Sequence, residues 1–194
     1  MPSSPPDSVK ILIAGGFGVG KTTLVGSVSE IAPLTTEAAL TDVSIGIDDT
    51  SQVETKDTTT VALDFGRITL GDMVLYLFGT PGQDRFWFMW DDLVRGAIGA
   101  LVLIDTRRLA DSFASIDFFE QRRVPFVIGI NQFDGAHTYS TPDIRTALQL
   151  ENHQAPIIFL DAREKYSSRD ALISLIDYRL GATPPPTPQK APNL

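Results

Sequence analysis

The sequence predicts an α/β fold with six strands in a mostly parallel sheet, one antiparallel strand, and five helices distributed over both faces. Two observations predict this architecture. Short apolar runs alternate with segments of helix length, which is typical of parallel strands joined by crossover helices. Between two of these runs, the Gly-Asp pair at residues 71–72 indicates a hairpin turn, and strands joined by a hairpin run antiparallel.

The first half of the chain is expected to supply three strands and one helix. The β-branched run Val9–Ala14 predicts a buried strand, and Lys21–Glu30 predicts a helix after a glycine-rich loop. The stretch Ile31–Asp57 is rich in Thr, Ser and Asp without a sustained period, so we expect a long irregular segment there. The two hairpin strands are Thr60–Thr69 and Met73–Phe78.

The second half of the chain continues the alternation of strands and helices. Buried strands are expected at Ala100–Ile104, Pro125–Ile130 and Pro156–Leu160. One helix should begin after Thr141, whose hydroxyl precedes a proline and is suited to capping. The last helix should end at Gly181, where glycine can take the left-handed conformation of a helix stop.

Composition narrows the class of protein. The chain has 194 residues, no cysteine and a net charge of −8. One cytoplasmic domain is expected at residues 9–181, with disordered flanks at 1–8 and 182–194. The absence of cysteine excludes disulfide scaffolds, and no apolar run is long enough to span a bilayer. The acidic balance argues against nucleic acid as a partner, so any polyanion must be held by a local device.

That local device is the segment Gly15–Thr22, which matches the pattern G-x-x-x-x-G-K-[ST] between a strand and a helix. Its glycines allow successive N–H groups to face an anion, and the following helix N-terminus adds positive potential. Lys21 is expected to reach the β- and γ-phosphates, and the Thr22 hydroxyl to bind Mg²⁺. The predicted phosphate contacts are Gly15, Gly18, Val19, Gly20, Lys21, Thr22 and Thr23.

Two later segments suggest which base is bound. Asn131-Gln132-Phe133-Asp134 resembles the guanine-reading Asn-Lys-x-Asp box of small GTPases, with Gln132 in the place of Lys. An Asp carboxylate can accept from both N1–H and N2–H of guanine, whereas Asn131 either reaches the base or ties neighbouring loops together. Asp161-Ala162-Arg163 is similar to the Ser-Ala-Lys loop, which implies that Ala162 N–H contacts the guanine O6. We therefore predict base contacts from Asn131, Gln132, Asp134, Ala162 and Arg163.

Two further motifs resemble the switches of Ras-like GTPases. In the segment at residues 80–84, Gly82 corresponds to the residue that senses the γ-phosphate and Gln83 to the one that orients the attacking water. Thr60 begins a Thr-x-x-x-Asp-Phe stretch similar to that of Rab-like proteins, which implies a role in binding Mg²⁺ and the γ-phosphate, although Thr58 and Thr59 are alternatives.

With five motifs in order, the chain resembles the Ras-like small GTPase superfamily over residues 9–180. The resemblance implies a P-loop NTPase fold (a Ras-like G domain), GTP or GDP and Mg²⁺ as ligands, and hydrolysis served by Gln83, Lys21 and Thr60. Two alternatives are a nucleotide-binding scaffold with little hydrolysis and a P-loop kinase or ATPase. Base choice separates the last of these from a GTPase.

Residues 77–90 look most like the conservon GTPases of actinobacteria, and Pro81-Gly82-Gln83 is similar to the bacterial MglA branch. Members of both groups are paired with roadblock (longin-like) proteins, so the resemblance implies a partner of this kind. If the protein associates with a membrane, we expect the association to be peripheral and to occur through partners. Phe86–Trp90 contains four aromatic residues and a Met in five positions. Because one helix face cannot bury all five, we predict a partner surface there.

Some positions depart from the Ras-like pattern. Gly79 stands where most members have the Asp that holds Mg²⁺ through water, and Asp64 on the neighbouring strand is a candidate replacement. Phe17 is beside the expected γ-phosphate position, where a large ring can hinder the catalytic Gln, so slow hydrolysis is expected. Arg67 and Arg85 are candidates for an arginine finger, which would stabilise the charge that develops on the phosphoryl group during hydrolysis.

Overall fold

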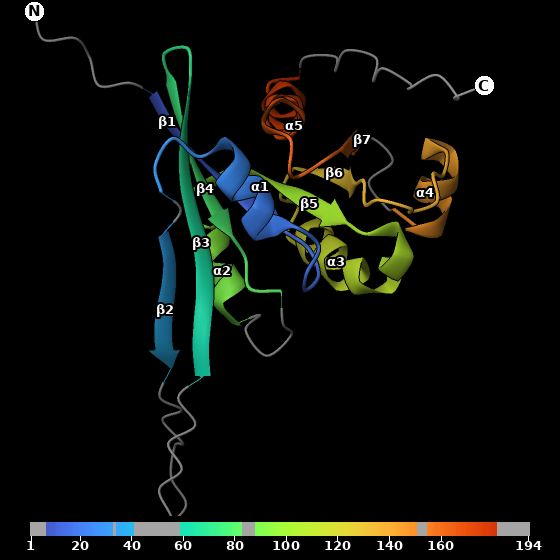
Figure 1. The fold of residues 1–194 in the computed structure, drawn as a ribbon, viewed down its shortest axis with the longest axis horizontal. Helices are drawn as coiled ribbons and strands as arrows, with labels where there is room; N and C mark the ends of the chain where they lie inside the picture. Colours follow the sequence, from blue (N-terminus) through green and yellow to red (C-terminus); the bar gives the residue numbers. More distant parts are fainter. Residues whose placement is uncertain (1–6, 33, 41–58, 83–87, 151–154, 182–194) are drawn as a thin grey trace, which may run out of the picture.

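One sheet of seven strands runs through the structure, a computed structural model that describes residues 7–32, 34–40, 59–82, 88–150 and 155–181. The strand order is β2-β3-β4-β1-β5-β6-β7 (Figure 1). The strands are β1 (Asp7–Ala14), β2 (Leu34–Leu40), β3 (Thr59–Leu70), β4 (Met73–Gly79), β5 (Ala97–Ile104), β6 (Phe126–Asn131) and β7 (Ile157–Leu160).

The predicted six strands are therefore one too few. The additional strand is β2, which lies in the segment expected to be irregular and pairs antiparallel with β3. β3 alone opposes the direction of the other described strands, so the single antiparallel strand is confirmed, as is the hairpin that joins it to β4. β1 begins at Asp7, inside the expected flank, while the remaining flank residues 1–6 and 182–194 lie outside the described residues.

Five α-helices are present in the described residues, as predicted: α1 (Lys21–Val28), α2 (Trp90–Val94), α3 (Phe113–Gln121), α4 (Thr141–Ala147) and α5 (Lys165–Arg179). A 3₁₀ helix, η2 (Thr106–Ser112), precedes α3. The cap of α4 is Ser140 and not Thr141, because the Ser140 hydroxyl accepts from the N–H of Asp143. Within the described part of the chain, no helix is both long and apolar enough to pass through a bilayer.

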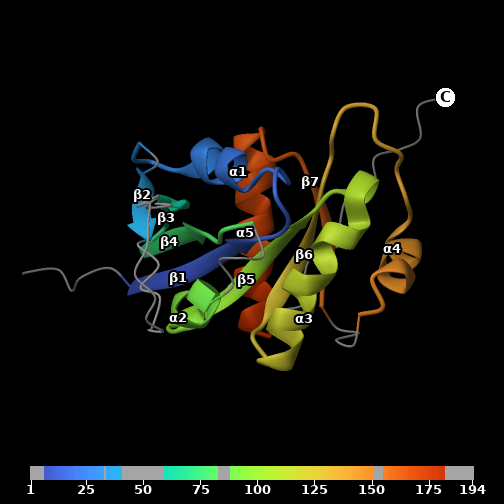
Figure 2. The ribbon, with the colours of Figure 1, turned by 90° about the horizontal axis from the view of Figure 1, so that it is seen from below.

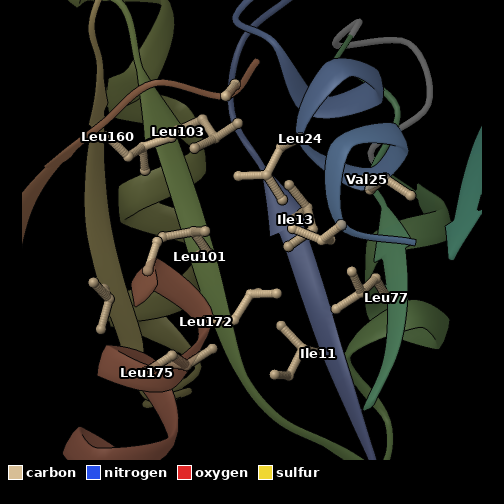
Figure 3. Close-up of a cluster of buried hydrophobic side chains, with 14 of the residues drawn as sticks. Ile11, Ile13, Leu24, Val25, Leu77, Leu101, Leu103, Leu160, Leu172 and Leu175 are labelled. Carbon is tan, nitrogen blue, oxygen red and sulfur yellow. The ribbon is translucent and has the colours of Figure 1, made fainter. Parts of the chain in front are cut away.

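The helices cover both faces of the sheet, and each face has its own apolar core. α1 and α5 lie on one face, whereas α2, α3 and α4 lie on the other (Figures 1 and 2). Leu24, Leu172 and Leu175 pack from α1 and α5 onto β1 and β5 (Figure 3). Ala100–Ile104 of β5 is fully buried because it is covered from both sides. This packing fixes the carboxyl ends of β1, β5 and β6, where the candidate site lies.

β3 is staggered between its neighbours. Its second half, Phe65–Leu70, pairs with β4. Its first half, Thr59–Asp64, pairs with β2 and has no partner on β4 (Figure 1). The first half of β3 and β2 thus form a two-stranded ribbon at the edge of the sheet.

Candidate functional site

The glycine-rich loop joins β1 to α1, and three of its glycines have left-handed backbone conformations. Gly15, Gly18 and Gly20 have φ angles of +131°, +71° and +106°, in the region that favours glycine. A Cβ at Gly15 would collide with the carbonyl oxygen of Leu103 on β5, so this position also has no space for a side chain. α1 begins at Lys21, directly after the loop. The loop is therefore shaped to direct backbone N–H groups and a helix N-terminus toward an anion.

Lys21 is held inside the loop. Its ammonium donates to the carbonyl oxygens of Gly15 at 2.8 Å and Gly16 at 2.7 Å. Burial lowers the pKa of Lys21 to about 8, and the negative charge of Asp64 opposes that shift. Gly82 lies against the same ammonium, since a Cβ there would be 2.6 Å from Lys21 Nζ. The glycine-rich loop (the phosphate loop) and the predicted switch segment at residues 80–84 therefore meet at the buried ammonium of Lys21.

Thr22 and Asp64 form the second polar contact of the site. The Thr22 hydroxyl donates to Asp64 Oδ2 at 2.6 Å, and the Asp64 carboxylate is buried. A Cβ at Gly79 would be 2.9 Å from Asp64 Cβ and 3.1 Å from Oδ2. The Asp64 side chain, coming from β3, therefore fills the space where a side chain from position 79 of β4 would lie.

This donor pair suits a hard divalent cation. Hydroxyl and carboxylate oxygens are the ligands that Mg²⁺ prefers, and Mg²⁺ commonly takes only one or two protein ligands together with phosphates. The described residues contain no cluster of three or more His, Cys, Asp or Glu side chains arranged to hold a metal. The residues present therefore fit a cation shared with a phosphorylated ligand.

Asn131 connects three parts of the site. Its buried side chain donates from Nδ2 to the Val19 carbonyl oxygen at 2.9 Å and accepts on Oδ1 from Ala162 N–H at 3.0 Å. Of the two roles considered for Asn131, the structure shows the one that ties loops together. The Ala162 N–H, expected to face a guanine O6, is instead engaged by Asn131. Gly20 is required here as well, because a Cβ at that position would be 2.6 Å from Asn131 Nδ2.

Asp134 and Arg163 are brought together at the exposed end of the site. Arg163 Nη1 and Nη2 donate to the two carboxylate oxygens of Asp134 at 2.9 and 3.1 Å. Arg163 Nε and Nη2 also donate to the two oxygens of Asp161 at 2.9 and 2.7 Å. The hydrogen bonds from Arg163 lower the pKa values of Asp134 and Asp161, so both carboxylates are charged at neutral pH. Gln132, beside them, is exposed.

Arg108 is a site residue that the sequence analysis did not identify. From η2, its Nη2 donates to the carbonyl oxygen of Phe17 at 2.7 Å, and its guanidinium forms ion pairs with Asp105 and Asp111 at 3.7 and 3.6 Å. Arg108 therefore supports the phosphate loop from outside. The available sequence signal was an Asp followed closely by two Arg residues at the end of a buried strand.

The structure leaves the roles of several predicted site residues untested. Gln83 and Arg85 lie outside the described residues, as do Phe86 and Trp87. Thr60 lies in β3, but its side chain is not among the described features. Their predicted roles therefore stay predictions.

Two predicted residues have other places in the fold. Trp90 is buried with 1% of its surface exposed and packs on Phe118 and Phe119, so it belongs to the core and not to a partner surface; by contrast, Phe88 is 61% exposed. Arg67 is an odd number of residues from Asp64 on β3, so strand alternation directs it to the opposite face of the sheet from the site. Arg67 is thus wrong as a candidate for the charge-stabilising arginine.

Comparison with known proteins places the chain in a family. Residues 13–182 match the family described as "Conserved hypothetical ATP binding protein". The chain belongs to this family. An uncharacterised protein of Methanocaldococcus jannaschii is 34% identical over 66% of this chain and 72% of its own length. Human ADP-ribosylation factor-related protein 1 is 29% identical over 60% of this chain, and the match spans little more than half (56%) of that protein.

A solved structure shows which fold this family member has. The Arl6 (BBS3) small GTPase of Trypanosoma brucei, with the bound nucleotide analogue GppNp, superposes with a TM-score of 0.62 at 15% identity, covering 91% of this chain and 99% of that one. This chain therefore has the α/β fold of Ras-like small GTPases, as the sequence predicted.

Proposed function

We propose that the protein is a guanine-nucleotide switch that binds GTP with Mg²⁺ and hydrolyses it slowly to GDP. The observation that carries the choice of base is the position of Asp134. Its carboxylate follows β6, is 86% exposed, and accepts a pair of parallel N–H donors on its two oxygens. Guanine offers such a pair, N1–H and N2–H, whereas adenine has an unprotonated N1 and no 2-amino group.

The family description names ATP, so base choice is the decisive test. We expect tight binding of GDP and GTP and at least a hundredfold weaker binding of ATP, measured by calorimetry with nucleotide-free protein. Asp134→Asn should weaken GDP binding and improve binding of xanthosine diphosphate, because the Asn amide can donate to the 2-oxo group of xanthine. Equal affinity of the wild type for ATP and GTP would contradict the proposal.

Magnesium would be held by Thr22, with Asp64 acting in the place of the missing carboxylate at Gly79. The contact between Thr22 and Asp64 and the filled space at Gly79 support this assignment. Bound Mg²⁺ would neutralise charge on the nucleotide phosphates. Asp64→Asn should reduce the Mg²⁺-dependent part of GDP affinity by about ten- to a hundredfold.

A relocated carboxylate provides the matched control. In the double variant Asp64→Gly with Gly79→Asp, removal of the Cβ at position 64 vacates space on β3 that can accept a carboxylate from β4. Recovery of Mg²⁺-dependent affinity in this variant would support the assignment. If Asp64→Asn leaves the Mg²⁺ dependence unchanged, Asp64 has no such role.

Thr60 is the proposed sensor of the triphosphate, together with Gly82. Thr60 lies four positions before Asp64 on the extended strand, which at ~3.3 Å per residue places their Cα atoms about 13 Å apart. For Thr60 to join Thr22 at one ion, the start of β3 must leave its present course. GTP binding would therefore be coupled to rearrangement of the ribbon that β3 forms with β2. A rearrangement of this kind, made by the triphosphate and reversed on hydrolysis, is the action of a molecular switch.

In the proposed hydrolysis, water attacks the γ-phosphorus and the bond to the β–γ bridging oxygen breaks, giving GDP and phosphate. Gln83 would orient the water, and Lys21 would stabilise the charge that develops on the phosphoryl group. Phe17, a residue of the glycine-rich loop that is 66% exposed, supports a slow intrinsic rate because its ring can crowd the attacking side. Single-turnover assays should give a rate on the order of 10⁻⁴ per second or slower. A complete absence of cleavage, even with a partner, would favour the scaffold.

The proposed partner is a roadblock (longin-like) protein, on the strength of the resemblance to MglA and conservon GTPases. Exposed Phe88, next to the predicted second switch, supports a docking surface there. Phe88→Ala should weaken binding of such a partner without changing GDP affinity. Equal partner binding by this variant would remove Phe88 from the interface.

A further inference from the structure

Arg163 holds a complete donor fork against two carboxylates. Its Nη1 and Nη2 engage both oxygens of Asp134, while Nε and Nη2 engage both oxygens of Asp161. Such planar, bidentate pairs are the strongest ion-pair geometry available to arginine, and lysine cannot reproduce them. The guanidinium therefore satisfies Asp134 in the same manner as a planar ligand with two parallel N–H groups.

The Watson–Crick edge of guanine is chemically similar to this fork. N1–H, C2 and N2–H of the base form a planar guanidine-like unit whose two donors are parallel. The base and Arg163 thus present the same donor pattern to the same two oxygens of Asp134. Both cannot occupy the in-plane positions of that carboxylate at the same time.

We infer that Arg163 is an internal competitor for guanine, a specificity-determining residue that the base must displace from Asp134. This inference rests on the proposed function. Asp161 gives the displaced side chain a second anchor, because the contacts from Nε and Nη2 to Asp161 do not involve Asp134. The exchange therefore requires a swing of the guanidinium and not its release into solvent. A base that offers only one donor cannot replace the fork in full, so the competitor also sharpens selection for guanine.

The test compares Arg163→Lys and Arg163→Gln with the wild type in the full chain. Arg163→Lys keeps the positive charge and removes the fork, whereas Arg163→Gln removes both. Arg122→Gln is the matched control, since it removes an arginine paired with Asp91 elsewhere on the surface. The measurements are the dissociation constants for GDP and for inorganic pyrophosphate, which has no base.

We expect Arg163→Lys to bind GDP roughly three- to tenfold more tightly than the wild type, the upper range for an exposed but bidentate pair. Pyrophosphate affinity should stay unchanged, and Arg122→Gln should match the wild type in both. In an Asp134→Ala background, Arg163→Lys should no longer improve GDP binding, because the carboxylate under competition is gone.

Two results would overturn the inference in distinguishable ways. If the wild type binds GDP and both Arg163 variants bind it equally or more weakly at unchanged pyrophosphate affinity, Arg163 is not a competitor, and the proposed function stands. If the wild type binds pyrophosphate but shows no preference for GDP over ADP, the proposed function and the inference both fail.

Discussion

Lys21 should make the nucleotide-free protein less stable at neutral pH than at alkaline pH. Its ammonium is buried, with 9% of the residue exposed, and its pKa falls from 10.5 to about 8. Because the folded-state pKa lies below the unfolded one, the folded state binds fewer protons between about pH 8 and 10.5. The free energy of unfolding therefore rises with pH in that window. The shift corresponds to about 2 to 3 kcal/mol between pH 7 and 10.

The assay is chemical unfolding of nucleotide-free protein at several pH values, followed by tryptophan fluorescence, to which buried Trp90 contributes. Lys21→Met removes the titrating group, so its stability advantage over the wild type should shrink by about 2 to 3 kcal/mol from pH 7 to 10. Lys165→Met, at an exposed lysine on α5, is the matched control for removal of a lysine side chain. A difference between Lys21→Met and wild type that stays constant within about 0.5 kcal/mol would refute the reasoning.

Three further predictions concern single side chains. Asn131→Ala leaves the Val19 carbonyl and the Ala162 N–H without their partner and should lower the free energy of unfolding by about 2 to 4 kcal/mol in denaturant titrations; an effect below that range would mean that water replaces the amide. Arg108→Ala should speed GDP dissociation about three- to tenfold in stopped-flow displacement, since the phosphate loop loses its outer support, and an unchanged rate would exclude that support. Trp90→Ala should cost about 3 to 5 kcal/mol of stability, whereas Phe88→Ala should stay within about 0.5, and equal costs would contradict their different burial.

The sequence was sufficient where the determining signals are local. The glycine spacing of the phosphate loop requires positive φ angles within a few residues, and the apolar runs of β1, β5 and β6 are explained by burial on both faces of the sheet. Gly181, with φ +72° after α5, is likewise a local requirement. These features follow from backbone sterics and hydrophobic periodicity, which can be recognised without knowledge of the fold.

The sequence was insufficient where distant residues supply the partner. β2 has no sustained apolar period, and it becomes a strand because β3 provides the backbone hydrogen bonds. Thr22 and Asp64 are 42 positions apart, and Arg108 and Phe17 are 91 apart, so neither contact has a signal in local spacing. Ser140 and Thr141 are adjacent hydroxyl residues, and either one is suited to cap α4. Because α4 begins at Thr141, Ser140 is the residue in the capping position.

The stagger of β3 divides one strand into two units of stability. Phe65–Leu70 pairs with β4, and Ile68 within it is buried in the core, so its amides should exchange with solvent only when the whole domain unfolds. Thr59–Asp64 pairs with β2 alone, and an isolated two-stranded ribbon is marginally stable in water. Its amides should therefore exchange through local opening, at a free energy well below that of global unfolding. Rearranging this half of the strand would then leave the core of the domain intact, even though both halves belong to one continuous element.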